Sequence, residues 1–195
     1  MNKLEGFFEL QKSGLPSVPW KQYNADTALD EKILWTVRTA VLIGDDLNLP
    51  RKVGVNASEA KAFADQLLNN LGENGIVLFY PYFIADKSGV MEVSFNKVVI
   101  EAVKDDLWNL VTHNKKDLTV IIAGEDVRYD GRQDFLSSEE ITELLRYSTS
   151  VSKMFRSLIA EGKSIFLEWS FAYKSDINKK PMGSKELVFY EIRSV

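Results

Sequence analysis

The chain has 195 residues, 45% of them hydrophobic and 27% charged, which is typical of a globular protein with a buried core. Its net charge of −4, without a basic stripe, argues against a nucleic-acid surface. It has no cysteine and one histidine, His113, which excludes disulfides, thiolate zinc sites, a cysteine nucleophile and multi-histidine metal sites. A bound metal would therefore be a hard cation held by carboxylates.

Targeting signals are missing from the sequence. The first residues include a glutamate and lack the apolar region of a signal peptide, and no apolar run approaches the length of a membrane span. We therefore expect a cytoplasmic protein that contacts neither membrane nor nucleic acid.

The N-terminal part is predicted to form a helix followed by a strand. Apolar residues recur at helical spacing over residues 3–13, and an extended loop over 15–19 and an irregular segment over 20–31 follow. Residues 33–41 are rich in β-formers, and Arg38 stands there among apolar and small residues. Such an arginine either pairs with a buried carboxylate or reaches into a cleft, where its planar guanidinium suits phosphate.

Two further helices are predicted from their end signals. Residues 57–71 follow Asn56, a good N-cap with Glu59 three residues on, and Gly72 can end this helix. The longest helix is expected over 137–161, because it begins with a Ser-x-x-Glu capping box and has an apolar face.

Between these two helices lies a block of predicted strands, over residues 75–84, 89–95, 97–103 and 118–123. Short turns separate most of them, which favours antiparallel pairing. Pro81, inside an aromatic run, suggests a strand interruption or a hinge. Strands grouped apart from helices indicate an α+β fold.

The chain closes with a predicted hairpin of residues 164–170 and 186–193. Glu191 and Arg193 are two apart and share a face, and Glu168 lies on the partner strand. These charged groups among apolar neighbours are costly to bury unless paired or bound. A structural ion cluster would satisfy them, and so would a divalent cation with a phosphate; taken alone, the residues favour the ion cluster.

Several short motifs follow one another along the chain: Lys3 with the helix up to Gly14-Leu15-Pro16, Val37-Arg38-Thr39, Asp45-Asp46 with Leu49-Pro50, Ala85-Asp86-Lys87-Ser88-Gly89-Val90-Met91, Ile165-Phe166-Leu167-Glu168-Trp169, and Tyr190-Glu191-Ile192-Arg193. Together they resemble the ATP-binding domain of phosphoenolpyruvate synthase and pyruvate phosphate dikinase. The resemblance implies an α+β, ATP-grasp-like fold, with two lobes of mostly antiparallel sheets and a cleft between them. It places an N-terminal lobe over 1–75 and a C-terminal lobe over 76–195, as one compact unit.

The resemblance also implies one site that holds ATP with Mg²⁺. The roles that it carries over are phosphate contacts for Lys3 and Arg38, an adenine-holding hinge for Tyr82 and Phe83, Mg²⁺ ligation for Glu168 and Glu191, and support of the transferred phosphoryl group for Arg193. The implied activity is nucleotide binding with phosphoryl transfer to a histidine on a separate swivelling-domain protein.

Departures from the family pattern leave a second interpretation open. The family's closing glutamine is Glu191 here, its proline is Ser194, and a glycine-containing segment is replaced by residues 104–107. The chain could thus be a catalytically decayed, ATP-grasp-like binding or regulatory module. An unrelated α+β protein with accidental similarity would fail to bring Lys3, Arg38, Glu168, Glu191 and Arg193 together in one cleft.

Overall fold

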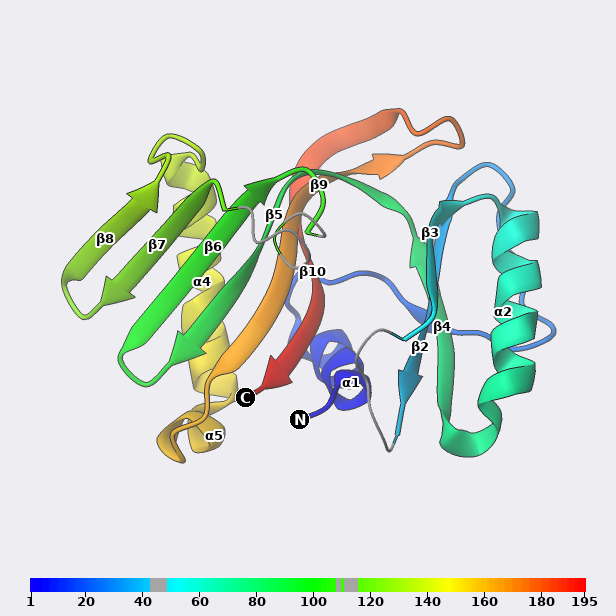
Figure 1. The fold of residues 1–195 in the computed structure, drawn as a ribbon, viewed down its shortest axis with the longest axis horizontal. Helices are drawn as coiled ribbons and strands as arrows, with labels where there is room; N and C mark the ends of the chain where they lie inside the picture. Colours follow the sequence, from blue (N-terminus) through cyan, green and yellow to red (C-terminus); the bar gives the residue numbers. More distant parts are fainter. Residues whose placement is uncertain (43–48, 108–109, 111–115) are drawn as a thin grey trace.

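The computed structural model describes residues 1–42, 49–107, 110 and 116–195. The Asp45-Asp46 pair and His113 lie outside the described residues. The fold is α+β, with two antiparallel sheets that stand beside one another (Figure 1). Within the described part of the chain, no helix is long and apolar enough to cross a membrane.

The smaller sheet is built from the N-terminal part of the chain. Its strands follow the order β1-β4-β2-β3, with the bounds β1 Lys21–Gln22, β2 Trp35–Val41, β3 Arg51–Val55 and β4 Gly75–Pro81. Helix α2 (Ala57–Leu71) covers its outer face, where Val37 and Phe79 pack against Ala60 and Ala64 (Figure 1). The opposite face of β2 carries Arg38 and turns toward the larger sheet.

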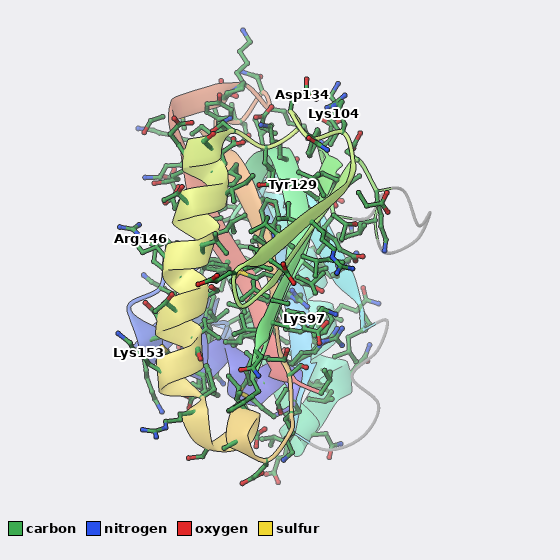
Figure 2. The ribbon with its side chains drawn as sticks, turned by 90° about the vertical axis from the view of Figure 1, so that its left-hand side faces the viewer. Lys97, Lys104, Tyr129, Asp134, Arg146 and Lys153 are labelled. Carbon is green, nitrogen blue, oxygen red and sulfur yellow. The ribbon has the colours of Figure 1, made fainter. Side chains whose placement is uncertain are left out.

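The larger sheet has the strand order β10-β9-β5-β6-β7-β8. The bounds are β5 Phe83–Ser94, β6 Lys97–Lys104, β7 Leu118–Ala123, β8 Asp126–Gly131, β9 Ile165–Ser175 and β10 Pro181–Ser194. Helix α4 (Ser138–Met154) lies on one face of this sheet, with the short α5 (Arg156–Ala160) after it (Figures 1 and 2). The main core lies between α4 and the sheet, where Leu144 and Val151 pack against residues such as Ile100 and Leu167.

Helix α1 (Lys3–Ser13) joins the two sheets at their base (Figure 1). Leu4 and Phe7 pack in a cluster that also holds Leu78 of the smaller sheet and Val188 of the larger one. The close approach of α1 to β10 depends on Gly6, because a Cβ at this position would lie 1.9 Å from the Ile192 carbonyl oxygen. The helix therefore rests directly on the backbone of β10.

The predicted helix ends agree with the structure at three of the capping positions. Asn56 accepts a hydrogen bond from the Glu59 N–H, Gly72 follows the last residue of α2, and Ser137 forms a capping box with Glu140. The prediction of a single helix over 137–161 is wrong. The backbone of Phe155 (φ −106°, ψ 26°) leaves the helical region, because its side chain turns into the core, and α5 starts after it.

The predicted strand over 75–84 is also divided in the structure. The chain crosses from the smaller to the larger sheet at Tyr82, whose N–H donates to the Leu34 carbonyl oxygen at 2.9 Å. The interruption suggested by Pro81 is confirmed. The strand predicted over 89–95 is present but begins earlier, because β5 runs from Phe83 to Ser94, with a bulge between Ala85 and Lys87.

Glu140 ties α4 to the larger sheet through two lysines and also completes the capping box of the helix. Its Oε2 accepts from the Ser137 N–H at 2.9 Å and from Lys87 Nζ at 2.6 Å, and its Oε1 accepts from Lys185 Nζ at 3.0 Å. Burial by itself raises the pKa of Glu140, but the hydrogen bonds from Lys87, Ser137 and Lys185 outweigh it and hold the pKa below its usual value.

We expect Glu140→Gln to lower the free energy of unfolding by about 1.5–3 kcal/mol at neutral pH, the range for hydrogen bonds to a charged group. The folded-state pKa is depressed, so the contribution is complete above the unfolded pKa of about 4.3 and disappears as pH falls through the lower folded value. Urea denaturation of both proteins across this range measures it. Glu143→Gln is the control, because this half-buried glutamate of α4 has only a surface ion pair with Arg146 at 3.8 Å. An equal deficit at all pH values would contradict the ionic origin.

Candidate functional site

A cavity of about 100 Å³ lies between the two sheets. The residues around it come from six strands of both sheets, from Tyr82 at the crossover and from the segment after β6: Thr36, Arg38, Arg51, Val53, Tyr80, Tyr82, Phe83, Ala85, Ser88, Asp106, Leu107, Glu168, Ser170 and Tyr190. Four of the seven predicted site residues are among them. The cavity is thus the place in the fold where most of the predicted site residues meet.

A buried ion pair between Arg38 and Glu191 lies beside the cavity. Arg38 Nη2 donates to Glu191 Oε2 at 3.2 Å, and their side chains are 11% and 2% exposed. The guanidinium also lies over the Phe7 ring at 5.1 Å and hydrogen-bonds Tyr80. Burial opposes the charge of Arg38, but Tyr80, Glu191 and Glu168 outweigh it, so the pKa of Arg38 lies above its ordinary value.

Lys3 approaches the same carboxylate from helix α1. Its Nζ is 3.7 Å from Glu191 Oε1, an atom that is buried and has no hydrogen-bond partner among the described residues. The capping box at the start of α1, formed by Asn2 and Glu5, holds this first turn in place. Two cations from distant parts of the chain therefore face one carboxylate.

Glu168 lies beside Glu191 on the neighbouring strand, where the two are cross-strand partners. Burial raises the pKa of Glu168, the neighbouring Glu191 raises it further, and Arg38, Lys3 and Arg193 only partly offset these effects. The Glu168 carboxyl therefore holds its proton to a higher pH than a free glutamate would. A ligand that brings positive charge to this point would relieve both carboxylates.

A β-bulge in β10 decides which side chains reach the cavity. Phe189 pairs with Trp169, but Glu191 pairs with Glu168, so Tyr190 is an extra residue in β10. Phe189 and Ile192 both pack in the core under α4, whereas Tyr190 packs in the cluster between the sheets. Strict alternation would have separated the faces of Tyr190 and Glu191; the bulge turns both away from α4.

Tyr82 and Phe83 stand where the chain crosses between the sheets, and both line the cavity. The Tyr82 ring lies so close to β3 that a Cβ at Gly54 would be 3.3 Å from it. Burial, and then Asp106, raise the pKa of the Tyr82 hydroxyl, which therefore stays protonated. The two aromatic rings thus form a wall at the hinge between the sheets.

Arg193, like Lys3 and Glu191, does not line the cavity. Its guanidinium carbon is 5.9 Å from the centre of the Phe166 ring, and its charge still lowers the pKa of Glu168 in part. The structure thus brings Lys3, Arg38, Glu168 and Glu191 together, with Arg193 beside them. Their roles toward a ligand stay predictions.

Sequence reasoning missed several polar residues of the cavity: Arg51, Tyr80, Ser88, Asp106, Ser170 and Tyr190. The Ser88 and Ser170 hydroxyls are 2.7 Å apart, and Ser88 also donates to the Asp105 carbonyl oxygen at 2.6 Å. Alternation from Leu78 could have placed Tyr80 on the face of Arg38. Tyr190 had no such signal, because the bulge breaks the alternation.

A magnesium ion would find two carboxylates here. The described residues contain no group of three or more His, Cys, Asp or Glu side chains that could hold a metal ion. The paired Glu168 and Glu191, one with a buried oxygen that lacks a hydrogen bond, offer the hard oxygen donors that Mg²⁺ prefers. The residues therefore fit a Mg²⁺ ion that is also held by a phosphate, and they do not form a complete protein cage.

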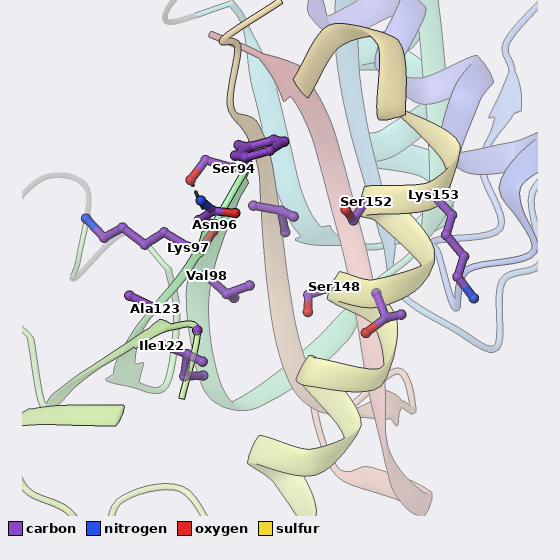
Figure 3. A pocket seen from close by; sticks show the side chains of 13 residues that line it. Ser94, Asn96, Lys97, Val98, Ile122, Ala123, Ser148, Ser152 and Lys153 are labelled. Carbon is purple, nitrogen blue, oxygen red and sulfur yellow. Dashed lines mark hydrogen bonds between the residues drawn. The ribbon is translucent and has the colours of Figure 1, made fainter. Parts of the chain in front are cut away.

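A larger hollow of about 840 Å³ lies elsewhere, between the β5–β6 turn and α4 (Figure 3). Ser148 and Ser152 of α4 face Val98 and Ile122 across it, and no carboxylate lines it. Size alone would favour this hollow. We consider the smaller cavity the candidate site, because the paired charges and the buried hydroxyls converge there.

Comparison with known proteins supports the fold. No protein-family profile and no curated protein matches the sequence. Among solved structures, the L-amino acid ligase from Bacillus licheniformis superposes with a TM-score of 0.51 at 12% identity, over 98% of this chain and 39% of the ligase. The D-alanine–D-alanine ligase from Bacillus anthracis has a TM-score of 0.51 at 9% identity, over 98% of this chain and 55% of that one. Both are ATP-grasp-type ligases, so this chain has an ATP-grasp-like fold and spans about half or less of their length.

Proposed function

We propose that the cavity between the sheets binds a nucleoside triphosphate, namely ATP together with Mg²⁺. One observation carries this proposal: Lys3, Arg38, Glu168 and Glu191, from three distant parts of the chain, converge beside a cavity between the two sheets of an ATP-grasp-like fold. Cations beside carboxylates are what a triphosphate with a divalent cation requires. The proposed lobes, over residues 1–75 and 76–195, correspond to the two sheets except that β4 (Gly75–Pro81) pairs within the smaller one.

The site residues are proposed to divide the nucleotide between them. Arg38 and Lys3 would bind phosphate oxygens, and Tyr82 and Phe83 at the crossover would hold the base. Glu168 and Glu191 would hold Mg²⁺, which neutralises phosphate charge when bound. In this arrangement Arg38 exchanges its contact with Glu191 for a phosphate, and the two carboxylates take the cation in its place.

Binding requires the sheets to move apart. Pockets for ligands of this size occupy roughly 300–1,000 Å³, whereas this cavity measures about 100 Å³. The crossover at Tyr82 is the natural hinge, because the chain passes there from one sheet to the other with no strand pairing of its own. The described conformation would then be the closed form, held by the Arg38–Glu191 contact.

We further propose a reaction for this site. The residues that resemble phosphoenolpyruvate synthase and pyruvate phosphate dikinase support phosphoryl transfer to a histidine on a separate swivelling-domain chain. Such transfer depends on positioning and charge stabilisation, which Arg38, Lys3 and Arg193 could supply. A purified histidine-domain chain incubated with this protein and radiolabelled ATP would gain an acid-labile label. Its absence would refute the transfer and leave nucleotide binding intact.

Thermal melting with and without MgATP tests nucleotide binding directly. At a ligand concentration 100 times the dissociation constant, binding adds about 2.7 kcal/mol to the stability, and each kcal/mol raises the melting temperature of a domain of this size by roughly 2–4 °C. We expect a rise with MgATP and a smaller one when EDTA removes the metal. No shift at millimolar MgATP would contradict the proposal.

Glu168→Gln separates the binding role from a structural one. We expect this variant to melt no lower than the wild-type protein, because it removes the repulsion between Glu168 and Glu191. It should lose the part of the shift that depends on Mg²⁺. Glu143→Gln on α4 serves as a control with the same chemical change far from the cavity, and it should keep the full shift.

A second candidate function is a non-catalytic binding or regulatory module with a decayed nucleotide site. Its support is that Arg38 already has a carboxylate partner and that the cavity is small. This reading expects no melting shift with MgATP for the wild-type protein. It also expects Glu168→Gln to change nothing except a small gain in stability.

A further inference from the structure

Strand β8 is an exposed edge of the larger sheet. Within the described residues it has a hydrogen-bonded neighbour, β7, on one side only, and all six of its residues are exposed. Figure 2 faces this edge, with Tyr129 in front of the sheet. Val127 is 50% exposed and Tyr129 42%, so the edge presents apolar surface together with open backbone groups. Such an edge is a ready template for another strand.

The turn before β8 determines which backbone groups face outward. Asp126 pairs with Ala123 across the two-residue turn Gly124-Glu125, and the closing residues of such a turn are hydrogen-bonded to each other. The backbone groups of Asp126, Arg128 and Asp130 therefore face β7. Because the direction alternates along a strand, those of Val127, Tyr129 and Gly131 face outward.

The side chains of β8 alternate in charge on one face, in the order Asp126, Arg128, Asp130. A partner strand must pair its own outward-facing residues with those of β8. If the partner is an antiparallel β8, placing Tyr129 opposite its own copy puts Arg128 opposite Asp130 twice. A shift of two residues in one direction puts Arg128 opposite Arg128, and in the other direction Asp130 opposite Asp130. The charge pattern therefore selects one register of self-pairing.

We propose that β8 pairs with β8 of a second copy of this chain, antiparallel, about a two-fold axis at Tyr129. The two six-stranded sheets then form one continuous sheet. Tyr129 faces its equivalent as a cross-strand aromatic pair, and each Arg128 lies opposite Asp130 of the second copy. Such an interface is isologous and closed, so it leads to dimers and not to fibres.

The strand lacks two of the features that usually block edge pairing, a proline or lysine on the edge and a bulge. It contains no proline and no lysine, and its pairing with β7 shows no bulge. The charges that it carries are complementary to its own copy and repel the neighbouring registers. Because a single strand pair buries less than a standard interface of roughly 1,200–2,000 Å², the dimer is expected to be weak and to dissociate on dilution.

Sedimentation velocity over a series of protein concentrations in low salt tests the proposal. The wild-type chain should shift toward the dimer mass as its concentration rises. Arg128→Asp and Asp130→Arg should each weaken association on the order of tenfold, because each places like charges opposite each other. The double variant Arg128→Asp with Asp130→Arg should restore it. Arg156→Asp, an equal charge change at an exposed position of α5, should leave association unchanged.

Val127→Pro provides an independent test that does not depend on charge. It removes an outward N–H that takes no part in the β7–β8 pairing, so the variant should melt close to the wild-type protein and stay monomeric. A wild-type chain that is monomeric at all concentrations would overturn the proposal. A dimer that survives both Val127→Pro and Arg128→Asp would overturn it as well.

Discussion

Replacing Arg38 by methionine is expected to lower the free energy of unfolding by about 3–5 kcal/mol, because removing one partner of a buried ion pair leaves the other charge uncompensated. Glu191 is 2% exposed, its closest cation is Arg38 at 3.2 Å, and Glu168 is its cross-strand partner. Lys3, at 3.7 Å from the carboxylate, replaces only part of this stabilisation. Urea denaturation at neutral pH measures the loss.

A double variant tests whether the stability loss of Arg38→Met comes from the unpaired charge of Glu191. Arg38→Met combined with Glu191→Met removes both members of the pair, and buried pairs replaced by apolar residues are often neutral or stabilising. We therefore expect the double variant to recover most of the loss. If Arg38→Met alone costs less than about 1 kcal/mol, as exposed pairs do, water reaches the pair in solution and the closed form described above is not the dominant one.

Changing Gly6 to alanine is expected to cost about 1–3 kcal/mol, the usual range for overpacking a well-packed contact. Two effects oppose each other here. Alanine favours a helix interior over glycine by about 1 kcal/mol. The new Cβ, however, would lie 1.9 Å from the Ile192 carbonyl oxygen, which is backbone and cannot rotate away. The steric clash outweighs the gain in helix propensity, so α1 must move away from β10.

The same variant connects packing with the site. Lys3 lies one turn before Gly6, so a displaced α1 should move Lys3 away from Glu191 and weaken any MgATP-dependent melting shift as well as lowering stability. Gln11→Ala, on the exposed face of α1, is the matched control and should stay within about 0.5 kcal/mol of the wild-type value. A Gly6→Ala protein as stable as the wild type would show that α1 is not seated on β10 in solution.

Local signals explain which parts of the fold were predictable. The caps at Asn56 and Ser137 and the closing hairpin depend on residues close in sequence, and the structure has them. The path through Tyr82 depends on which sheet each half of the segment joins. Periodicity is the same on both sides of that point, so the sequence suggested an interruption at Pro81 without showing that β5 continues through Ala85 to Ser94.

The candidate site also combines features that the local sequence sets with features that tertiary packing sets. By itself the sequence determined where α2 and α4 begin, the α+β class and the presence of Arg38, Glu168 and Glu191 on strands, because capping and side-chain alternation act over a few residues. Only the tertiary structure decided that Arg38 meets Glu191, 153 residues away. That contact requires the two sheets to be held together around α1, and it requires a bulge at Tyr190 to turn the end of β10. Neither event leaves a local pattern, because both arise from the packing of segments that are distant in the chain.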